Sequence, residues 1–153
     1  MKRTILVATA LGLALFAAGC AKKEVKNPIV TARHENYEQV KQAFRAIGDE
    51  LKKESPSFEV IDTNAEKLDA LAKDLPSWFP EGSGPETGAK TEALPVIWEK
   101  WPDFEEAAGK LQTAVGGLVA ASSAEDLGLT GEAAKNVGGA CKSCHDTFRK
   151  EDD

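Results

Sequence analysis

The sequence has fewer basic than acidic residues. Lysine and arginine together number 19, against 25 aspartates and glutamates, and the formal net charge is −6 over 153 residues. A nucleic-acid-binding protein needs a basic surface to meet the phosphate backbone, and an anionic lipid surface calls for a basic amphipathic stripe. Neither feature is present. The charge balance therefore excludes nucleic acid as a partner. A protein partner recognised by charge should be basic, and the alternative is that the charge serves only solubility.

Motifs for catalysis are absent as well. The sequence contains no nucleophile elbow, no phosphate-binding loop and no paired carboxylates in a cleft-like pattern. It also lacks internal repeats, low-complexity tracts and the polar–apolar alternation that would predict strands. We therefore expect an all-α protein that is not an enzyme.

Sulfur-containing and imidazole side chains are scarce, with one methionine, three cysteines and two histidines. Three of these side chains stand together near the end of the chain, as Cys141-Lys142-Ser143-Cys144-His145. On a helix, positions 141, 144 and 145 fall on one face, so two thiols and an imidazole can meet one ligand. This spacing is typical of c-type haem attachment, with Cys141 and Cys144 as thioether sites and His145 as the proximal iron ligand.

Other chemistries use similar residues. A Cys-x-x-Cys pair can be a dithiol redox centre, although that motif normally opens a helix in a βαβ unit, and no strand pattern precedes it here. The same three side chains could belong to a zinc site whose fourth ligand would be His34 or a carboxylate. The pentapeptide could also occur by chance. An export signal at the start of the chain favours the haem interpretation.

The N-terminal segment has the features of that signal. Two basic residues precede an apolar run from Ile5 to Ala18, which is too short to span a membrane. Small residues directly before Cys20 resemble a bacterial lipobox, in which the cysteine becomes the lipidated first residue, although Ala17 stands where leucine is more usual. We expect a signal peptide over residues 1–19 and a lipid at Cys20, with a freely soluble periplasmic product as the alternative.

Removal of residues 1–19 would leave 134 residues with a net charge of −8, because the signal carries two positive charges. That length suits one domain and is enough to bury a core. We predict a linker over residues 20–27 and a single domain over residues 28–153. Met1, the only methionine, would also be removed, so His/Met ligation of a haem iron is excluded.

Apolar residues recur at steps of three and four in four segments, which predicts four helices. The first helix would begin at Asn27-Pro28 and end before Pro56. The second would begin at about Thr63, which forms a capping box with Glu66.

The third helix would begin at Asp103, with Glu106 as a further capping signal, and the fourth near Thr130. The proline- and glycine-rich segment 76–95 between the second and third helices predicts a long loop. The two cysteines fall on the core-facing side of the last helix and would direct a haem into the interior. The prediction is an antiparallel four-helix bundle with one covalently attached haem c in its core.

Arg33 falls within the apolar stripe of the first helix, whereas His34 lies at the edge of that stripe. A buried arginine needs an anionic partner, because an unpaired buried charge is costly, and a haem propionate would be such a partner. The alternative is an arginine that extends to solvent. Ligation of the iron by His34 together with His145 is a further alternative, which would favour simple electron transfer.

The sequence is similar to the cytochrome c′ family over nearly the whole mature chain. The similarity lies in four segments: Arg33-x-x-x-Tyr37, Leu75-Pro76-Ser77-Trp78-Phe79, Pro95-Val96-Ile97-Trp98, and the haem motif from Val137 to His145 with Arg149. The family implies a periplasmic electron-transport protein with high-spin, five-coordinate haem c that binds nitric oxide or carbon monoxide. Its members are commonly homodimers through the first two helices.

The resemblance also implies roles for individual residues beyond the attachment motif. Arg33 would contact a propionate, and Arg149 would lie near the proximal histidine. Tyr37 stands where the family places a bulky distal residue, and its hydroxyl could donate a hydrogen bond near the iron or ligate it as tyrosinate. His34 and Glu92 are expected at the haem edge.

Two functions remain open from the sequence. The first is an electron carrier that exchanges electrons with redox partner proteins. The second is a gas-binding protein that captures or senses nitric oxide, which the lack of a strong sixth ligand would permit.

Overall fold

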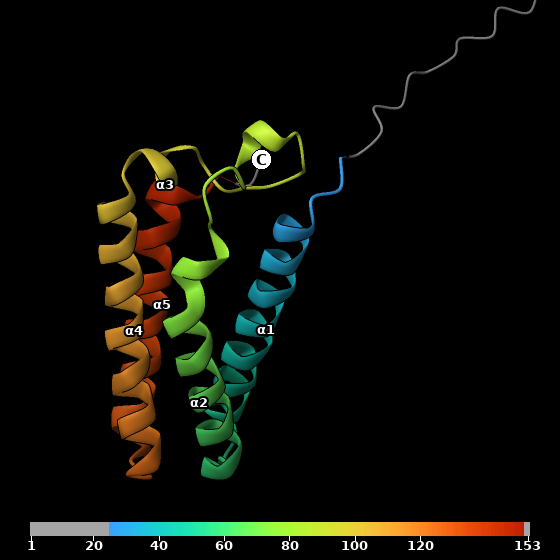
Figure 1. Ribbon diagram of the computed structural model, residues 1–153. Helices are drawn as coiled ribbons and strands as arrows, with labels where there is room; N and C mark the ends of the chain where they lie inside the picture. Colours follow the sequence, from blue (N-terminus) through green and yellow to red (C-terminus); the bar gives the residue numbers. More distant parts are fainter. Residues whose placement is uncertain (1–24, 152–153) are drawn as a thin grey trace, which may run out of the picture.

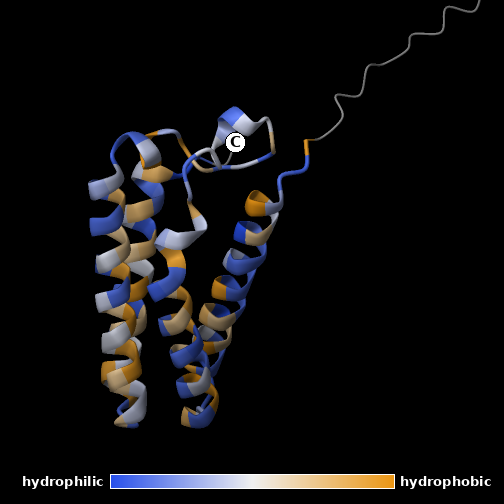
Figure 2. Ribbon diagram, viewed as in Figure 1, coloured by the Kyte–Doolittle hydropathy of each residue, from blue (hydrophilic) through white to orange (hydrophobic). Residues whose placement is uncertain are grey.

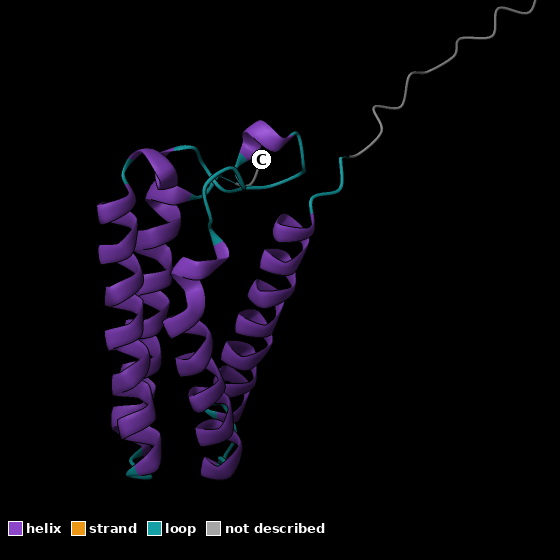
Figure 3. Cartoon of the chain, in the orientation of Figure 1, coloured by secondary structure: helices purple, strands orange, loops and turns teal. Residues whose placement is uncertain are grey.

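The structure is a computed structural model that describes residues 25–151. Within that range the chain is helical, with loops and no strands (Figure 3). The elements are α1 (Pro28–Glu50), α2 (Phe58–Asp74), the 3-10 turns η1 (Leu75–Trp78) and η2 (Pro85–Thr87), α3 (Val96–Glu99), α4 (Trp101–Ser123) and α5 (Leu127–Phe148). The predicted signal peptide over residues 1–19 and the predicted lipid site at Cys20 lie outside the described residues.

The four long helices α1, α2, α4 and α5 run alternately up and down, which confirms the predicted four-helix bundle (Figure 1). α4 packs against both α2 and α5, and α1 packs against α2. The backbones of α1 and α5 lie farther apart than those of these pairs. Side chains approach across the space between them, since a Cβ atom added at Gly138 would lie 3.8 Å from Cζ of Phe44.

Hydrophobic residues recur among hydrophilic ones along each long helix, as the steps of three and four in the sequence predict (Figure 2). α1 begins where expected, because the side-chain oxygen of Asn27 accepts hydrogen bonds from the backbone N–H groups of Ile29 (2.9 Å) and Val30 (3.2 Å). Pro28 occupies the first turn, where no N–H is needed. None of the helices in the described part of the chain is long and apolar enough to cross a bilayer.

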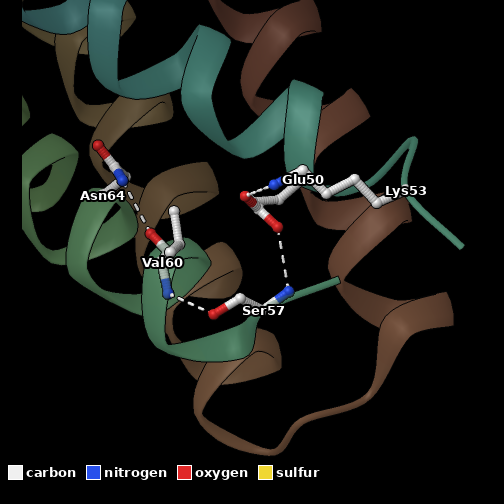
Figure 4. Close-up of polar contacts among 5 residues, drawn as sticks. All are labelled: Glu50, Lys53, Ser57, Val60 and Asn64. Carbon is white, nitrogen blue, oxygen red and sulfur yellow. Dashed lines mark hydrogen bonds and ion pairs between the residues drawn. The ribbon is translucent and has the colours of Figure 1, made fainter. Parts of the chain in front are cut away.

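α2 begins at Phe58, five residues before Thr63, so the predicted start was wrong. The helix is capped by Ser57, whose hydroxyl oxygen accepts from the N–H of Val60 at 3.3 Å (Figure 4). The carboxylate of Glu50 accepts from the N–H of Ser57 at 3.0 Å and forms an ion pair with Lys53. These contacts fix the turn between α1 and α2 at the end of the bundle opposite the long loop.

The predicted starts of the last two long helices also need correction. α4 begins at Trp101, before Asp103, and its first turn contains a proline rather than a side-chain cap. α5 begins at Leu127 instead of near Thr130, because the carboxylate of Asp126 accepts from the third N–H of the helix at 2.9 Å.

Two groups of buried side chains make up the core. The aliphatic cluster fills the end near the α1–α2 turn and consists of Ala43, Ile47, Ile61, Ala65, Leu68, Ala72, Val115, Leu118 and Val137. The aromatic cluster fills the end near the long loop and consists of Leu75, Trp78, Phe79, Ile97, Phe104, Ala108 and Phe148. The boundary between the two clusters lies beside the C-terminal half of α5, which carries the cysteine motif.

Candidate haem-binding site

The three residues of the motif project from the C-terminal half of α5. Cys141 is half-buried and packs against the aliphatic cluster, whereas Cys144 is half-buried and packs against the aromatic cluster. His145 is exposed, and it lines a surface hollow of about 110 Å³. The helix thus directs two thiols toward the bundle interior and an imidazole toward its edge.

Burial governs the protonation of the thiols. It raises the pKa of Cys141, and it raises the pKa of Cys144 to about 11. A dithiol redox centre needs a thiolate with a lowered pKa, so these shifts run against that alternative. The zinc alternative lacks a ligand set, because residues 25–151 contain no group of three or more histidine, cysteine or acidic side chains that could hold a metal ion.

The raised pKa predicts slow alkylation of Cys144 in protein produced without haem. At pH 8 a thiol with a pKa of about 11 is about 0.1% thiolate, so iodoacetamide should react about 100-fold more slowly than in urea. The folded state favours the neutral thiol, so this contribution to stability is present at neutral pH and is lost as the pH rises toward about 11. Mass spectrometry of the Cys144 peptide measures the rate. Equal rates in folded and urea-unfolded protein would show that the thiol is not desolvated.

Tyr37, on α1, packs against the aromatic cluster, as Cys144 on α5 does. Its ring makes an edge contact with Trp78, at 5.3 Å between centroids, and a second with Phe79 at 6.4 Å. Burial raises the pKa of the Tyr37 hydroxyl, and the nearby thiol of Cys144 adds to that shift. The phenol therefore stays protonated at neutral pH, which disfavours tyrosinate as an iron ligand.

Arg33 is buried, with only 2% of its surface exposed, so the predicted burial is confirmed and the solvent-extended alternative was wrong. Its terminal nitrogens donate four hydrogen bonds to the long loop. The acceptors are the Trp78 carbonyl (3.4 Å), the Ser83 hydroxyl (3.2 Å), the Ser83 carbonyl (2.9 Å) and the Thr91 hydroxyl (3.2 Å). The guanidinium also lies 4.5 Å from the ring centroid of Phe79. Arg33 therefore organises the loop.

The acceptors around Arg33 are neutral, and its ion-pair partner is missing among residues 25–151. Burial lowers the pKa of the guanidinium, although an arginine remains charged at any physiological pH. The negative charge of Glu86 acts on the guanidinium from beyond ion-pair distance, and opposes that lowering of the pKa. A buried cation whose hydrogen-bond acceptors are all neutral is a favourable neighbour for an added carboxylate. Contact between Arg33 and a propionate stays a prediction, and it would involve the Nε–H group or replace one of the loop acceptors.

The remaining predicted residues are distributed over two places. Glu92 and Arg149 come together, with 2.7 Å between Oε2 and Nε, in an ion pair that the sequence did not predict. His34 is exposed on α1, away from the buried face that carries Arg33. Ser83 and Thr91, the side-chain partners of Arg33, were not predicted, because a serine and a threonine in an irregular loop give no sequence signal for burial.

The fold and the site define a helical-bundle haem protein of the c type. Comparison with known protein families identifies which one. Residues 28–149 match the family model described as Cytochrome C′. The chain belongs to the cytochrome c′ family, whose members bind a single c-type haem with iron. The residues present fit this group, because two inward-facing thiols, an adjacent imidazole and a buried cation lie at one end of the bundle.

Curated relatives and solved structures agree on the family. Cytochrome c′ from Pararhodospirillum photometricum is 38% identical, over 72% of this chain and 92% of the relative. Cytochrome c′ from Rhodospirillum rubrum is 31% identical, over 99% of this chain and 100% of the relative. The crystal structure of cytochrome c′ from Rubrivivax gelatinosus aligns with a TM-score of 0.72 and 28% identity, over 80% of this chain and 94% of that one. The nitric oxide complex of a cytochrome c prime variant from Alcaligenes xylosoxidans aligns with a TM-score of 0.73 and 27% identity, over 81% of this chain and 94% of that one.

Proposed function

We propose that the chain carries one haem c through thioether bonds at Cys141 and Cys144, with His145 as the axial iron ligand, and that it is a periplasmic electron carrier. The observation that carries this proposal is the placement of the motif on α5, with both thiols turned inward and the imidazole at the exposed edge. The bound haem would supply a one-electron couple between ferric and ferrous iron.

The protein's own residues would orient this group and tune it. The aromatic cluster excludes water from the side of the site that faces the long loop. The buried charge of Arg33 favours the more negative, reduced form of any neighbouring redox group. The exposed edge beside His145 leaves that side accessible to a redox partner protein, and the acidic net charge of the chain suits a basic one.

Gas binding is the second candidate, and it has its own supporting observation. Tyr37 is a protonated phenol packed beside Cys144, Met1 is the only methionine, and His34 is exposed. None of these offers a strong sixth ligand, so a high-spin, five-coordinate iron with an open distal position is expected. The nitric oxide complex of the variant from Alcaligenes xylosoxidans supports nitric oxide as a ligand, and carbon monoxide is expected from the resemblance to the family.

Absorption spectra of the periplasmically expressed protein test both candidates. Ferric and ferrous forms are recorded before and after the addition of carbon monoxide and of nitric oxide. Broad high-spin bands that shift with gas would support covalent haem with an open site. Sharp low-spin bands that ignore gas would point to ligation by His34, and a spectrum without haem bands would refute both functions.

Tyr37→Ala should open the distal side. We expect the rate constant for carbon monoxide binding to the ferrous protein to rise about tenfold, equivalent to about 1.4 kcal/mol of steric barrier. Tyr37→Phe is the control, because it keeps the ring and removes only the hydroxyl. Flash photolysis measures both rates, and identical rates for Tyr37→Ala and the unmodified protein would place Tyr37 away from the ligand path.

Three further parts of the proposal concern location and assembly. Export to the periplasm and a lipid at Cys20 rest on the sequence of residues 1–20. Membrane contact would occur only through that lipid. A homodimer through α1 and α2 rests on the resemblance to the family.

A further inference from the structure

A short segment of the long loop is tied to the end of α5. The segment, residues 91–94, is called the strap here. The N–H of Leu94 donates to the carbonyl of Phe148 at 3.0 Å, and the N–H of Lys150 donates to the carbonyl of Glu92 at 2.8 Å. The strap therefore pairs in antiparallel fashion with the residues that end α5.

The ion pair between Glu92 and Arg149 reinforces this pairing at the turn that carries the axial ligand. The carboxylate and the guanidinium are 2.7 Å apart, and the N–H of Arg149 donates to the carbonyl of His145 at 3.1 Å. His145 is exposed, so burial does not hold its imidazole in place. The backbone of this last turn carries the imidazole, so the contacts that hold the turn bear on its orientation.

The other side of the strap is tied to α1. The hydroxyl oxygen of Thr91 accepts from Nη2 of Arg33 at 3.2 Å and also from the N–H of Ala93 at 3.2 Å. The strap thus spans from the buried arginine of α1 to the last turn of α5. These are the two long helices whose backbones lie farther apart than those of the other packed pairs.

We propose that the strap closes the bundle between α1 and α5 at its haem-bearing end. Within it, Glu92 is a positioning residue that acts through Arg149 to fix the last turn of α5 and the orientation of the His145 imidazole. This inference rests on the proposed function, because the orientation of His145 matters for iron only if His145 is the axial ligand.

The test compares variants of the haem-loaded protein. Glu92→Gln and Arg149→Gln each remove one side of the ion pair, and the double variant Glu92→Arg with Arg149→Glu restores it with reversed charges. Lys73→Gln is the control, because it breaks another i,i+4 ion pair, Lys73–Asp69 (2.5 Å) on α2, outside both the strap and the cysteine motif. Two quantities are measured, namely amide hydrogen exchange over residues 145–151 and the electron paramagnetic resonance spectrum of the ferric iron.

We expect Glu92→Gln and Arg149→Gln to raise the exchange rates about twofold to fivefold, as for a partly exposed ion pair, and to shift the ferric spectrum. The charge-reversed pair should return both quantities toward those of the unmodified protein, and Lys73→Gln should leave both unchanged. Unchanged exchange in Glu92→Gln, or failure of the reversed pair to restore it, would overturn the strap. Faster exchange with an unshifted ferric spectrum would overturn the positioning role.

The proposed haem function and the role of the strap can fail independently. If the unmodified protein carries no haem, the proposed function fails, yet the exchange measurement on the same variants still tests the strap, because its contacts are made by protein atoms alone. If haem is present and the ferric spectrum is unaffected by Glu92→Gln, the proposed function stands and the positioning role of Glu92 fails.

Discussion

Replacement of Arg33 by alanine is expected to lower the free energy of unfolding of the haem-free protein by about 3 kcal/mol. The guanidinium is 2% exposed and donates four hydrogen bonds to the long loop. Its removal leaves the carbonyls of Trp78 and Ser83 and the hydroxyl of Thr91 without that donor, and each unsatisfied buried group costs about 1–3 kcal/mol. Urea unfolding followed by circular dichroism measures the loss.

Two controls show whether the effect comes from the loop contacts. Arg33→Lys keeps the charge but replaces the planar fork by a single ammonium, so it should recover only part of the stability. Arg45→Ala removes an exposed arginine from the same helix and should change the free energy of unfolding by less than about 0.5 kcal/mol. Equal losses for Arg33→Ala and Arg45→Ala would show that the loop does not depend on Arg33.

The same variant should alter the redox behaviour of the loaded protein while leaving haem attached. Loss of a buried positive charge removes an interaction that favours the reduced state, so the midpoint potential should fall. Arg33→Lys should keep the potential closer to that of the unmodified protein. Superimposable titrations for Arg33→Ala and the unmodified protein would mean that Arg33 is remote from the redox group.

Phe104→Ala is expected to destabilise the protein by about 3–5 kcal/mol, the usual range for truncation of a fully buried phenylalanine. Phe104 is 1% exposed, and its ring makes edge contacts with Phe79 (4.9 Å between centroids) and with Phe148 (5.4 Å). Those contacts join α4 to the long loop and to the end of α5. Loss of the ring should therefore loosen the haem-bearing end as well as lower the free energy of unfolding.

Leu118→Ala separates these two effects. Leu118 is fully buried in the aliphatic cluster, and its truncation should cost about 2–5 kcal/mol. Because Leu118 lies near the C-terminal end of α4, at the end of the bundle opposite the long loop, Leu118→Ala should keep the haem absorption spectrum unchanged where Phe104→Ala alters it. A loss below about 1 kcal/mol for Phe104→Ala would contradict the packing described for the aromatic cluster.

Periodicity predicted the helices well, whereas local capping signals predicted their starts poorly. The stripe of α1 and the Asn27-Pro28 start were both confirmed, because the cap and the apolar pattern agree there. Thr63 with Glu66 resembled a capping box, yet Ser57 begins α2, since its N–H is held by Glu50 from the preceding helix. A contact between two helices decided that boundary, and such contacts are not visible in a local pattern.

In the candidate site, likewise, the sequence predicted positions on one helix but not contacts between distant segments. Burial of Arg33 followed from its position in the stripe, but its partners did not, because they lie 45–58 residues away in sequence and are neutral. Glu92 and Arg149 were both expected near the haem, and their pairing was missed because 57 residues separate them. Sequence patterns locate residues on one element, and only the packed structure shows which distant loop meets them.

The strap has a consequence for the order in which the molecule folds. Helix pairs such as α4 and α5 are joined by a short turn, so their contacts can form early. The strap instead needs Arg33 from the first helix, Thr91 and Glu92 from the middle of the chain, and Arg149 from its last turn. Contacts between segments so distant must await the slow closure of long loops. We therefore expect the strap end of the bundle to close last, which would keep Cys141 and Cys144 accessible to the attachment chemistry after the other helix pairs have assembled.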